Sequence, residues 1–173
     1  ALLQIRQQVA RLSAIVRQLL DFGRAAGSPM RRIPAEVLAH SAAAAVADEL
    51  AALQVRLELQ APAQTLYCRV DPPRFEQALT NLLRNAAQAS PGGLVRLRWW
   101  RDGAELLLQV EDDGPGIAES NRAALFEPFF TTKPVGEGSG LGLAVAHGVV
   151  GECGGRIELV DGGLSGAAFR IAL

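Results

Sequence analysis

The sequence predicts a two-layer α+β domain with a mostly antiparallel sheet, preceded by one long helix. Three observations predict this fold class. The first 26 residues repeat apolar side chains at helical spacing and then meet glycines and a proline. The residues after them alternate between helical segments and short strand-like segments that include a hairpin signal. Hydrophobic residues make up 49% of the 173 residues, which is enough for one core.

The N-terminal segment, residues 1–26, predicts a single helix of the kind found in helical bundles. Its apolar stripe is narrow, as in a coiled-coil seam, and polar side chains separate its members. The helical pattern stops at Gly23, and Gly27-Ser28-Pro29 follows as a strong breaker. We therefore divide the chain into residues 1–28 and residues 29–173. The stripe consists of Leu2, Ile5, Val9, Leu12, Val16, Leu19 and Leu20.

The second part begins with an Ala-rich helix predicted over about Ala35 to Ala52, after Pro34. Two strand candidates follow it, with Pro62 marking the turn between them. Asp71-Pro72-Pro73 then predicts a helix start, because aspartate is a good N-cap and proline suits the first helical positions. The two strand candidates are Val55 to Leu59 and Thr65 to Val70.

The helix that starts at Pro72 should run to about Ser90, because Pro91-Gly92-Gly93 ends it. A hairpin should follow around Asp102-Gly103. The region 112–142 is rich in glycine and proline and predicts a long functional loop rather than a simple turn. The remaining predicted elements are strands over Leu94 to Arg101 and Glu105 to Val110, a helix over Leu141 to Cys153, and strands over Arg156 to Val160 and Ala167 to Leu173.

Charge and cysteine content exclude several classes of function. The 17 Lys and Arg residues balance 18 Asp and Glu residues, so nothing favours nucleic acid or an anionic membrane as the partner. Cys68 and Cys153 are far apart and lack neighbours at metal-ligand spacing, which indicates ordinary thiols in a reducing compartment. No apolar run reaches the roughly 18 residues of a membrane span. We expect a cytoplasmic piece without direct membrane contact, compatible with a membrane anchor elsewhere in the parent protein.

The helix from Pro72 carries amides on one face. Asn81, Asn85 and Gln88 are spaced by four and three residues, while Leu79, Leu82, Leu83 and Ala86 cover the opposite side. Amide oxygens can coordinate a hard cation such as Mg²⁺, and amide NH₂ groups can hold phosphate. The same stripe can also be an exposed polar face without a ligand.

Two glycine-containing segments add to this pattern. In Glu111-Asp112-Asp113-Gly114-Pro115-Gly116, a carboxylate at a strand end can accept a hydrogen bond from an exocyclic amine, and glycines let backbone approach a flat ring. In 136–143, a glycine-rich loop runs directly into a helix, where free backbone N–H groups and the helix dipole favour phosphate. Taken singly, the first segment could be an acidic turn and the second a hinge. Neither the dinucleotide fingerprint nor the P-loop spelling is present.

Together these segments resemble the ATP-binding motifs of sensor histidine kinases. Asn81 to Ala86 is similar to the N box, Asp112 to Ile117 to the first glycine box, and Gly138 to Leu143 to the second. Phe126 to Lys133 is similar to the F box, in the spelling of nitrogen-regulation-type kinases. The resemblance covers about residues 33–173 and implies the Bergerat fold of the superfamily that also holds gyrase, heat-shock chaperone and mismatch-repair ATPases.

The resemblance implies roles for individual residues. Asn85 would bind Mg²⁺, which would bridge the phosphates of ATP. Asp112 would hold the adenine amine, with Gly114 and Gly116 admitting the ring. Residues 131–140 would form a lid over the phosphates, and Phe126, Phe129 and Phe130 would either anchor it or serve as core aromatics. The implied ATP site comprises Asn81, Asn85, Gln88, Asp112, Gly114, Gly116, Ile117, Thr131, Thr132, Lys133, Gly138, Ser139, Gly140, Leu141, Gly142 and Leu143.

Two departures from the family pattern matter. The ATPases of the superfamily have glutamate four residues before the metal-binding asparagine, where this chain has Asn81, and an amide cannot take a proton from water. In Gly166-Ala167-Ala168-Phe169, the family usually has Gly-Thr before the phenylalanine, so one hydroxyl near the nucleotide is missing.

The acceptor histidine is also absent from the expected context. Neither His40 nor His147 is followed by an acidic residue on a dimerising helix, so we expect both to have structural or surface roles. Residues 1–28 resemble the second helix of the family's acceptor hairpin, which would form a homodimer in the full-length protein.

The expected function is therefore that of a protein-histidine kinase catalytic part, which uses ATP and Mg²⁺ to phosphorylate a histidine outside this chain. The phosphoryl group would then pass to an aspartate of a response regulator, and the chain alone would not autophosphorylate. Two alternatives stay open at this point: a nucleotide-binding pseudokinase or sensor module, and a slow ATPase of the gyrase-like branch.

Overall fold

The computed structural model describes residues 28–134 and 138–173. The predicted helix over residues 1–26 lies outside the described residues. The main sheet has five strands in the order β2-β4-β5-β7-β6, and a separate pair is formed by β1 and β3. The strands are β1 (Arg31–Pro34), β2 (Arg56–Gln60), β3 (Tyr67–Val70), β4 (Leu94–Asp102), β5 (Glu105–Asp112), β6 (Arg156–Val160) and β7 (Ala168–Ala172).

The main sheet is mostly antiparallel, as predicted. Only β2 and β4 pair in parallel, whereas β4–β5, β5–β7 and β6–β7 are antiparallel. The hairpin around Asp102-Gly103 is confirmed, with Asp102 opposite Glu105. Alternate residues of β4 are buried, which is the pattern of a sheet with only one covered face.

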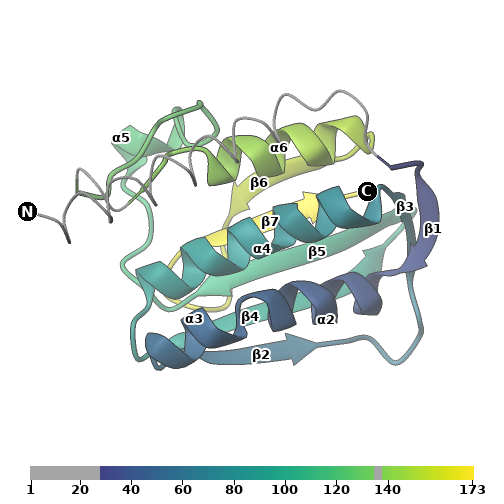
Figure 1. Cartoon of the computed structure of the whole chain (residues 1–173), viewed down its shortest axis with the longest axis horizontal. Coiled ribbons are helices and arrows are strands. Elements are labelled where there is room, and N and C mark those ends of the chain that lie inside the picture. Colours follow the sequence, from purple (N-terminus) through teal and green to yellow (C-terminus); the bar gives the residue numbers. More distant parts are fainter. Residues whose placement is uncertain (1–27, 135–137) are drawn as a thin grey trace, which may run out of the picture.

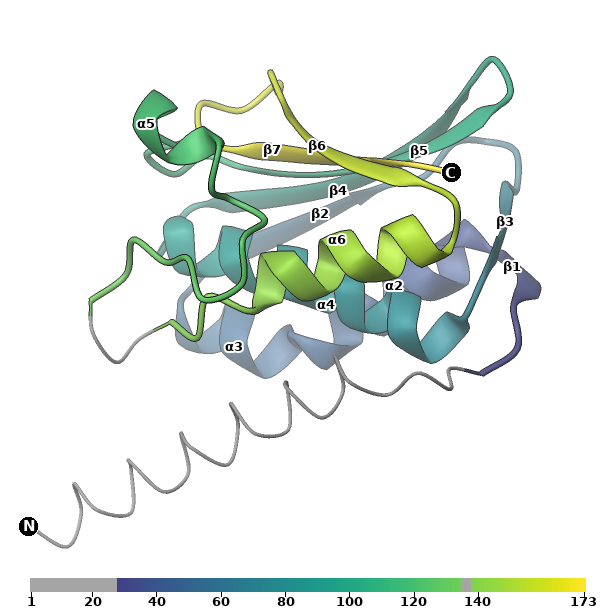
Figure 2. The same cartoon turned by 90° about the horizontal axis from the view of Figure 1, so that it is seen from above.

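Helices form the second layer. The helices are α2 (Ala35–Ala45), α3 (Ala47–Ala52), α4 (Pro72–Ala89), α5 (Glu119–Arg122) and α6 (Gly142–Glu152). Figure 2 shows α2, α4 and α6 side by side on one face of the sheet, and α4 contacts both of the others. The two-layer prediction is therefore confirmed. No helix within the described ranges is long and apolar enough to cross a membrane.

The central helix α4 follows the sequence closely. The Asp71 carboxylate accepts a hydrogen bond from the Arg74 backbone at 3.5 Å, so Asp71 is the N-cap that the sequence predicted. The apolar face predicted for this helix is buried in the core, at Leu79, Leu82, Leu83 and Ala86. On the rest of the helix surface, the amides of Asn81 and Asn85 lie beside the start of α6, whereas the Gln88 amide contacts Glu49 of α3.

The structure of the first half corrects or adds to the sequence analysis at three points. The helix predicted over Ala35 to Ala52 is two helices, because the backbone leaves helical geometry at Val46 and both Val46 and Leu50 are buried. Residues 31–34 form a strand that the sequence analysis missed. Pro62 does not join two paired strands, because β2 pairs with β4 while β3 pairs with β1. Strand partners depend on distant segments, which a local pattern does not encode.

Candidate functional site

A cavity of about 500 Å³ lies between α4, the start of α6 and the connection from β5 to α6. In Figures 1 and 2 this connection lies at the left-hand end of the helices. The cavity brings together residues from all four sequence motifs. Of the sixteen predicted site residues, fourteen line it: Asn81, Asn85, Gln88, Asp112, Gly116, Ile117, Thr131, Thr132, Lys133, Gly138, Ser139, Gly140, Gly142 and Leu143.

Two predicted site residues, Gly114 and Leu141, are not among the lining residues. Leu141 is only 2% exposed and packs away from the cavity. A Cβ on Gly114 would lie 2.5 Å from the carbonyl oxygen of Ala89. The absence of a side chain at Gly114 therefore allows the backbone to contact the end of α4. The sequence motif had suggested instead that Gly114 admits the adenine ring.

The amide face of α4 meets the first residue of α6. The Asn81 side-chain NH₂ donates to the Gly142 carbonyl at 3.2 Å. A Cβ on Gly142 would lie 3.8 Å from Nδ2 of Asn85, so that amide also stands beside the start of α6. The first backbone N–H groups of a helix have no intrahelical partner and favour anions. An amide oxygen able to bind a hard cation and a helix start able to bind phosphate are thus adjacent.

Asp112 marks the opposite end of the cavity. It is the last residue of β5 and only 3% exposed. Its Oδ1 accepts hydrogen bonds from the backbone N–H of Gly114 at 2.9 Å and of Ala167 at 3.2 Å. Burial raises the pKa of this carboxyl above its ordinary value of 3.8, partly offset by these two hydrogen bonds. Within the described part of the chain the hydrogen bonds to this side chain use Oδ1, which leaves Oδ2 for a ligand donor.

The loop before β7 closes around Asp112. The Gly166 N–H donates to the Asp112 carbonyl at 2.9 Å, and the Asp112 N–H donates to the Ala167 carbonyl at 3.0 Å. A Cβ on Gly166 would lie 2.0 Å from Oδ1 of Asp112, so only glycine fits. Ala167 lines the cavity and Ala168 does not, which places the missing family hydroxyl at position 167.

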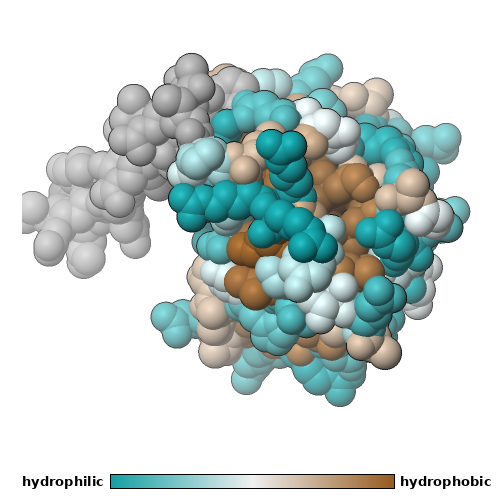
Figure 3. All heavy atoms as spheres, turned by 90° about the vertical axis from the view of Figure 1, so that its right-hand side faces the viewer, coloured by the Kyte–Doolittle hydropathy of each residue, from teal (hydrophilic) through white to brown (hydrophobic). Residues whose placement is uncertain are grey.

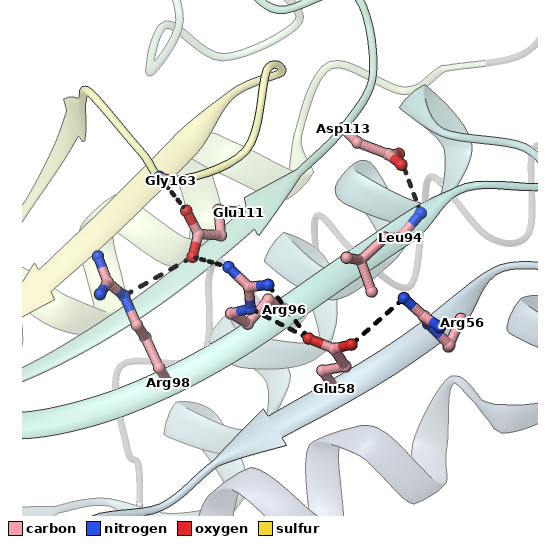
Figure 4. Close-up of polar contacts among 8 residues, drawn as sticks. All are labelled: Arg56, Glu58, Leu94, Arg96, Arg98, Glu111, Asp113 and Gly163. Carbon is pink, nitrogen blue, oxygen red and sulfur yellow. Dashed lines mark hydrogen bonds and ion pairs between the residues drawn. The ribbon is translucent and has the colours of Figure 1, made fainter.

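The carboxylates of Glu111 and Asp113, on either side of Asp112, bind groups outside the cavity (Figure 4). Glu111 is 1% exposed and accepts from the Gly163 N–H at 2.6 Å and from Arg96 at 3.3 Å. Asp113 accepts from the Leu94 N–H at 2.9 Å, at the start of β4. Only Asp112 lines the cavity. Successive side chains of a strand point to opposite faces, which separates Asp112 from Glu111 at the end of β5.

Charged residues gather at the α4 rim of the cavity. The Lys133 ammonium donates to the Gln88 side-chain oxygen. The Gln88 NH₂ group donates to Glu49 of α3 at 2.7 Å, and the Arg84 Nε donates to the same carboxylate at 2.8 Å. Arg84 lines the cavity but was missed by the sequence analysis. Arg84 lies three residues after Asn81 and so on the same face of the helix, and this spacing could have predicted that it lines the site.

Aromatic side chains support the connection beyond the cavity. The Phe126 ring lies edge-on to Phe169 at 6.3 Å and stacks on His147 at 5.0 Å. Phe130 lines the cavity, whereas Phe129 is 60% exposed. His40 bonds the Glu36 carbonyl at 2.7 Å within its own helix. Each histidine thus has a contact within its own domain, a phenylalanine ring for His147 and a helix carbonyl for His40.

The other lining residues that the sequence analysis did not assign to the site are mostly small or apolar. Their types match those of core positions, so periodicity could not single them out. They are Ala86, Ala89, Pro115, Ala118, Asn121, Leu125, Phe130, Ala167 and Phe169.

A second cavity of about 340 Å³ lies at the β1–β3 end, lined by Arg32, Tyr67 and Arg101 among others. Figure 3 faces this end of the molecule, where hydrophilic and hydrophobic residues are intermixed. The Arg32 guanidinium lies 3.8 Å from the centre of the Tyr67 ring. This cavity contains no residue of the four motifs.

Sequence comparison gives a family and relatives. Residues 70–173 match the family described as histidine kinase-, DNA gyrase B-, and HSP90-like ATPase. Sensor histidine kinase ZraS of Escherichia coli strain K12 is 31% identical over 96% of this chain and 36% of that protein. C4-dicarboxylate transport sensor protein DctB of Pseudomonas aeruginosa is 32% identical over 98% of this chain and 28% of that protein. The chain thus spans about a third of the length of these relatives.

Structural comparison points the same way. A mycobacterial sensor histidine kinase, MprB, has a TM-score of 0.72 at 29% identity, covering 83% of this chain and 96% of that one. Histidine kinase ThkA in complex with the response regulator TrrA has a TM-score of 0.80, covering 98% of this chain and 48% of that one. At 22% identity, the likeness to ThkA shows the fold alone.

Proposed function

This chain belongs to the histidine kinase-, DNA gyrase B-, and HSP90-like ATPase family, and within that family we propose that it is the catalytic part of a two-component sensor histidine kinase. It binds ATP with Mg²⁺ and transfers the γ-phosphoryl group to a histidine outside this chain. The phosphoryl group then passes to an aspartate of a response regulator. Full-length protein forms a homodimer through helices that include residues 1–28.

The observation that carries the proposal is the convergence of four separate motifs on one cavity with chemically distinct ends. Asp112 offers a buried acceptor at one end, suited to the exocyclic amine of adenine, whereas guanine presents a carbonyl there. Asn85 and the start of α6 stand at the other end, suited to Mg²⁺ and phosphate. Asp112, Asn85 and the start of α6 line one continuous cavity, as the binding of a base joined to a polyphosphate requires.

The fit to Mg²⁺ rests on the donor set. Within the described residues, no three His, Cys, Asp or Glu side chains gather into a metal cluster. Asn85 lines the cavity beside the start of α6 and would be the protein ligand, and phosphate and water oxygens would complete the coordination, as Mg²⁺ commonly prefers. When bound, the ion would neutralise charge on the phosphates. Arg84 and Lys133 add positive charge at the same rim, and the α6 start adds backbone donors.

Asn81 favours transfer to an acceptor over hydrolysis. Its amide cannot serve as a base, and its NH₂ group is used to hold the Gly142 carbonyl. The residues of this chain can thus bind and orient the nucleotide, while the side chain at position 81 cannot activate water as the glutamate of the ATPases does. Phosphoryl transfer then depends on a nucleophile supplied in line.

Calorimetric titration tests the binding step. ATP and ADP should bind in the presence of Mg²⁺ and GTP should bind more weakly, and Asn85→Ala should remove the Mg²⁺ dependence. Glu76→Gln, on the same helix but away from the cavity, is the matched control. Equal affinity for ATP and GTP would refute the assignment of Asp112.

Radiolabelled ATP tests the transfer step. The chain alone should stay unlabelled, while a separately supplied acceptor hairpin with the family's histidine–acidic pair should become labelled. Label on the chain that disappears when His40 or His147 is replaced would contradict the proposal, because that histidine would then be the acceptor. Rapid release of inorganic phosphate without any acceptor would indicate an ATPase instead.

A further inference from the structure

Glu49 lies outside the cavity but touches two residues that line it. It belongs to α3, and its two carboxylate oxygens each accept one hydrogen bond from α4. Oε2 accepts from Arg84 Nε at 2.8 Å, and Oε1 accepts from Gln88 Nε2 at 2.7 Å. The carboxylate is thus a bridge between a cation and an amide on the cavity rim.

The bridge determines which way the Gln88 amide points. An ionised carboxylate only accepts hydrogen bonds, so it must face the NH₂ group of Gln88 and not its oxygen. The Gln88 oxygen is then turned to the other side, where the Lys133 ammonium donates to it. In this orientation the Gln88 oxygen binds the Lys133 ammonium, and its NH₂ group binds Glu49. The sequence had suggested instead that such NH₂ groups hold phosphate.

The held ammonium lies beside the glycine-rich turn that precedes α6. A Cβ on Gly138 would be 3.2 Å from Cδ of Lys133 and 2.7 Å from Oγ1 of Thr131. Arg84 and Lys133 therefore stand at the phosphate end of the cavity, on either side of Gln88. Like charges on one rim repel each other, and the Glu49 carboxylate, which binds Arg84 directly, offsets part of this repulsion.

We propose that Glu49 is a positioning residue of the nucleotide site: through Gln88 and Arg84 it holds Lys133 and Arg84 where they attract the added negative charge of a triphosphate. The inference rests on the proposed function. The Glu49 and Arg84 side chains are 29% and 39% exposed, and pairs of this kind contribute little to folding. Replacing Glu49 should therefore change the affinity for the more highly charged nucleotides, and should leave the stability of the fold nearly unchanged.

The test compares Glu49→Gln with Asp48→Asn in the 173-residue chain. Both changes remove one carboxylate charge from α3, but Asp48 is exposed and does not reach the rim network. Calorimetry should show Glu49→Gln weakening Mg²⁺·ATP binding by about tenfold, the scale of a charge-assisted hydrogen bond. ADP binding should weaken less and adenosine binding should not change. Asp48→Asn should leave all three affinities unchanged, and Glu49→Asp should recover part of the ATP affinity.

A second comparison asks whether the effect passes through Gln88. In a Gln88→Leu background, Glu49→Gln should cost clearly less ATP affinity than it does in the wild-type chain, because one arm of the bridge is already gone. Equal losses of ATP and adenosine affinity, or a fully additive double variant, would overturn the proposal. A wild-type chain that binds adenosine but shows no gain for ATP would refute the proposed function itself, and this inference with it.

Discussion

The two ends of the cavity are built in different ways. At the Asp112 end, backbone groups make the contacts: Gly114, Gly166 and Ala167 all bond Asp112 through main-chain N–H groups. At the α6 end, side chains make most of them, as Lys133, Gln88 and Asn81 do. Asp112 is buried, whereas Thr131 and Thr132 are exposed.

Under the proposed function, this difference would separate recognition of the base from handling of the phosphates. Strand pairing holds the base end before any ligand arrives, so its selectivity requires little reorganisation. The contacts at the phosphate end can exchange partners, since each is one side chain with water as a competitor. A kinase needs both properties, because the base identifies the substrate and the phosphates must be released to an acceptor. The predictions below test whether the two ends are independent.

The largest effect should come from Gly166→Ala. Its Cβ would lie 2.0 Å from Asp112 Oδ1 and 2.6 Å from the Gly114 nitrogen, and these two atoms are hydrogen-bonded to each other. The free energy of unfolding should fall by about 3 kcal/mol, the upper range for overpacking. Thermal and urea unfolding measure this. Gly151→Ala, where nothing lies within 4 Å of the added Cβ, should instead stabilise the chain slightly. Equal effects would show that the base end is not rigid.

Asp112→Asn should weaken ATP binding by about 1.5–3 kcal/mol and remove the preference over GTP. Asp113→Asn makes the same change in charge beside it, but faces Leu94 and should leave binding intact. Calorimetry with both nucleotides checks this. A preference for ATP that survives in Asp112→Asn would show that another group reads the base.

Asp112→Asn, which should weaken ATP binding, should stabilise the folded chain. Burial raises the pKa of Asp112 above 3.8, so the ionised carboxyl costs folding free energy at neutral pH. Asp112→Asn should therefore unfold at a higher temperature than the wild type near pH 7. The gain should shrink as the pH falls through the raised pKa and vanish below 3.8, where the wild-type carboxyl is protonated as well.

Gly140→Ala is the counterpart at the phosphate end. Gly140 has a φ of +67°, and its Cβ would lie 2.3 Å from the carbonyl carbon of Phe129. The left-handed backbone costs about 1–2 kcal/mol for alanine, and the exposed segment can shift to relieve the contact. ATP affinity should fall while adenosine affinity stays constant in parallel titrations. If adenosine affinity fell as much, the two ends would be coupled and the comparison would fail.

Ala167→Thr should have the smallest effect, in the favourable direction. Ala167 lines the cavity and its N–H bonds Asp112, so a hydroxyl there would stand next to the base end. One added neutral hydrogen bond predicts about a threefold gain in affinity for both ATP and adenosine. Calorimetry distinguishes this from a gain limited to ATP, which would place position 167 at the phosphate end instead.

Much of the site could be predicted because its residues cluster in short motifs with helical or turn spacing. The amides of α4 follow from a three- and four-residue repeat, and the helix start after the glycine-rich loop follows from breaker residues. Glu49 could not be predicted. It lies 35 residues before Arg84 and 39 before Gln88, and an acidic residue on an Ala-rich helix is ordinary without knowledge of what packs beside it.

By itself, the sequence determined most of the elements and the mostly antiparallel α+β class, because local spacing and turn residues dictate how each segment folds. Its four motifs also resembled those of the family. The tertiary structure alone decided which strands pair, why the Ala-rich segment breaks at Val46, and what Glu111 and Asp113 contact on either side of Asp112. It also decided that Gly166 must be glycine, since the atoms that exclude a side chain come from residues more than fifty positions away. Such contacts exist only after distant segments have been brought together, and no pattern along one segment contains them.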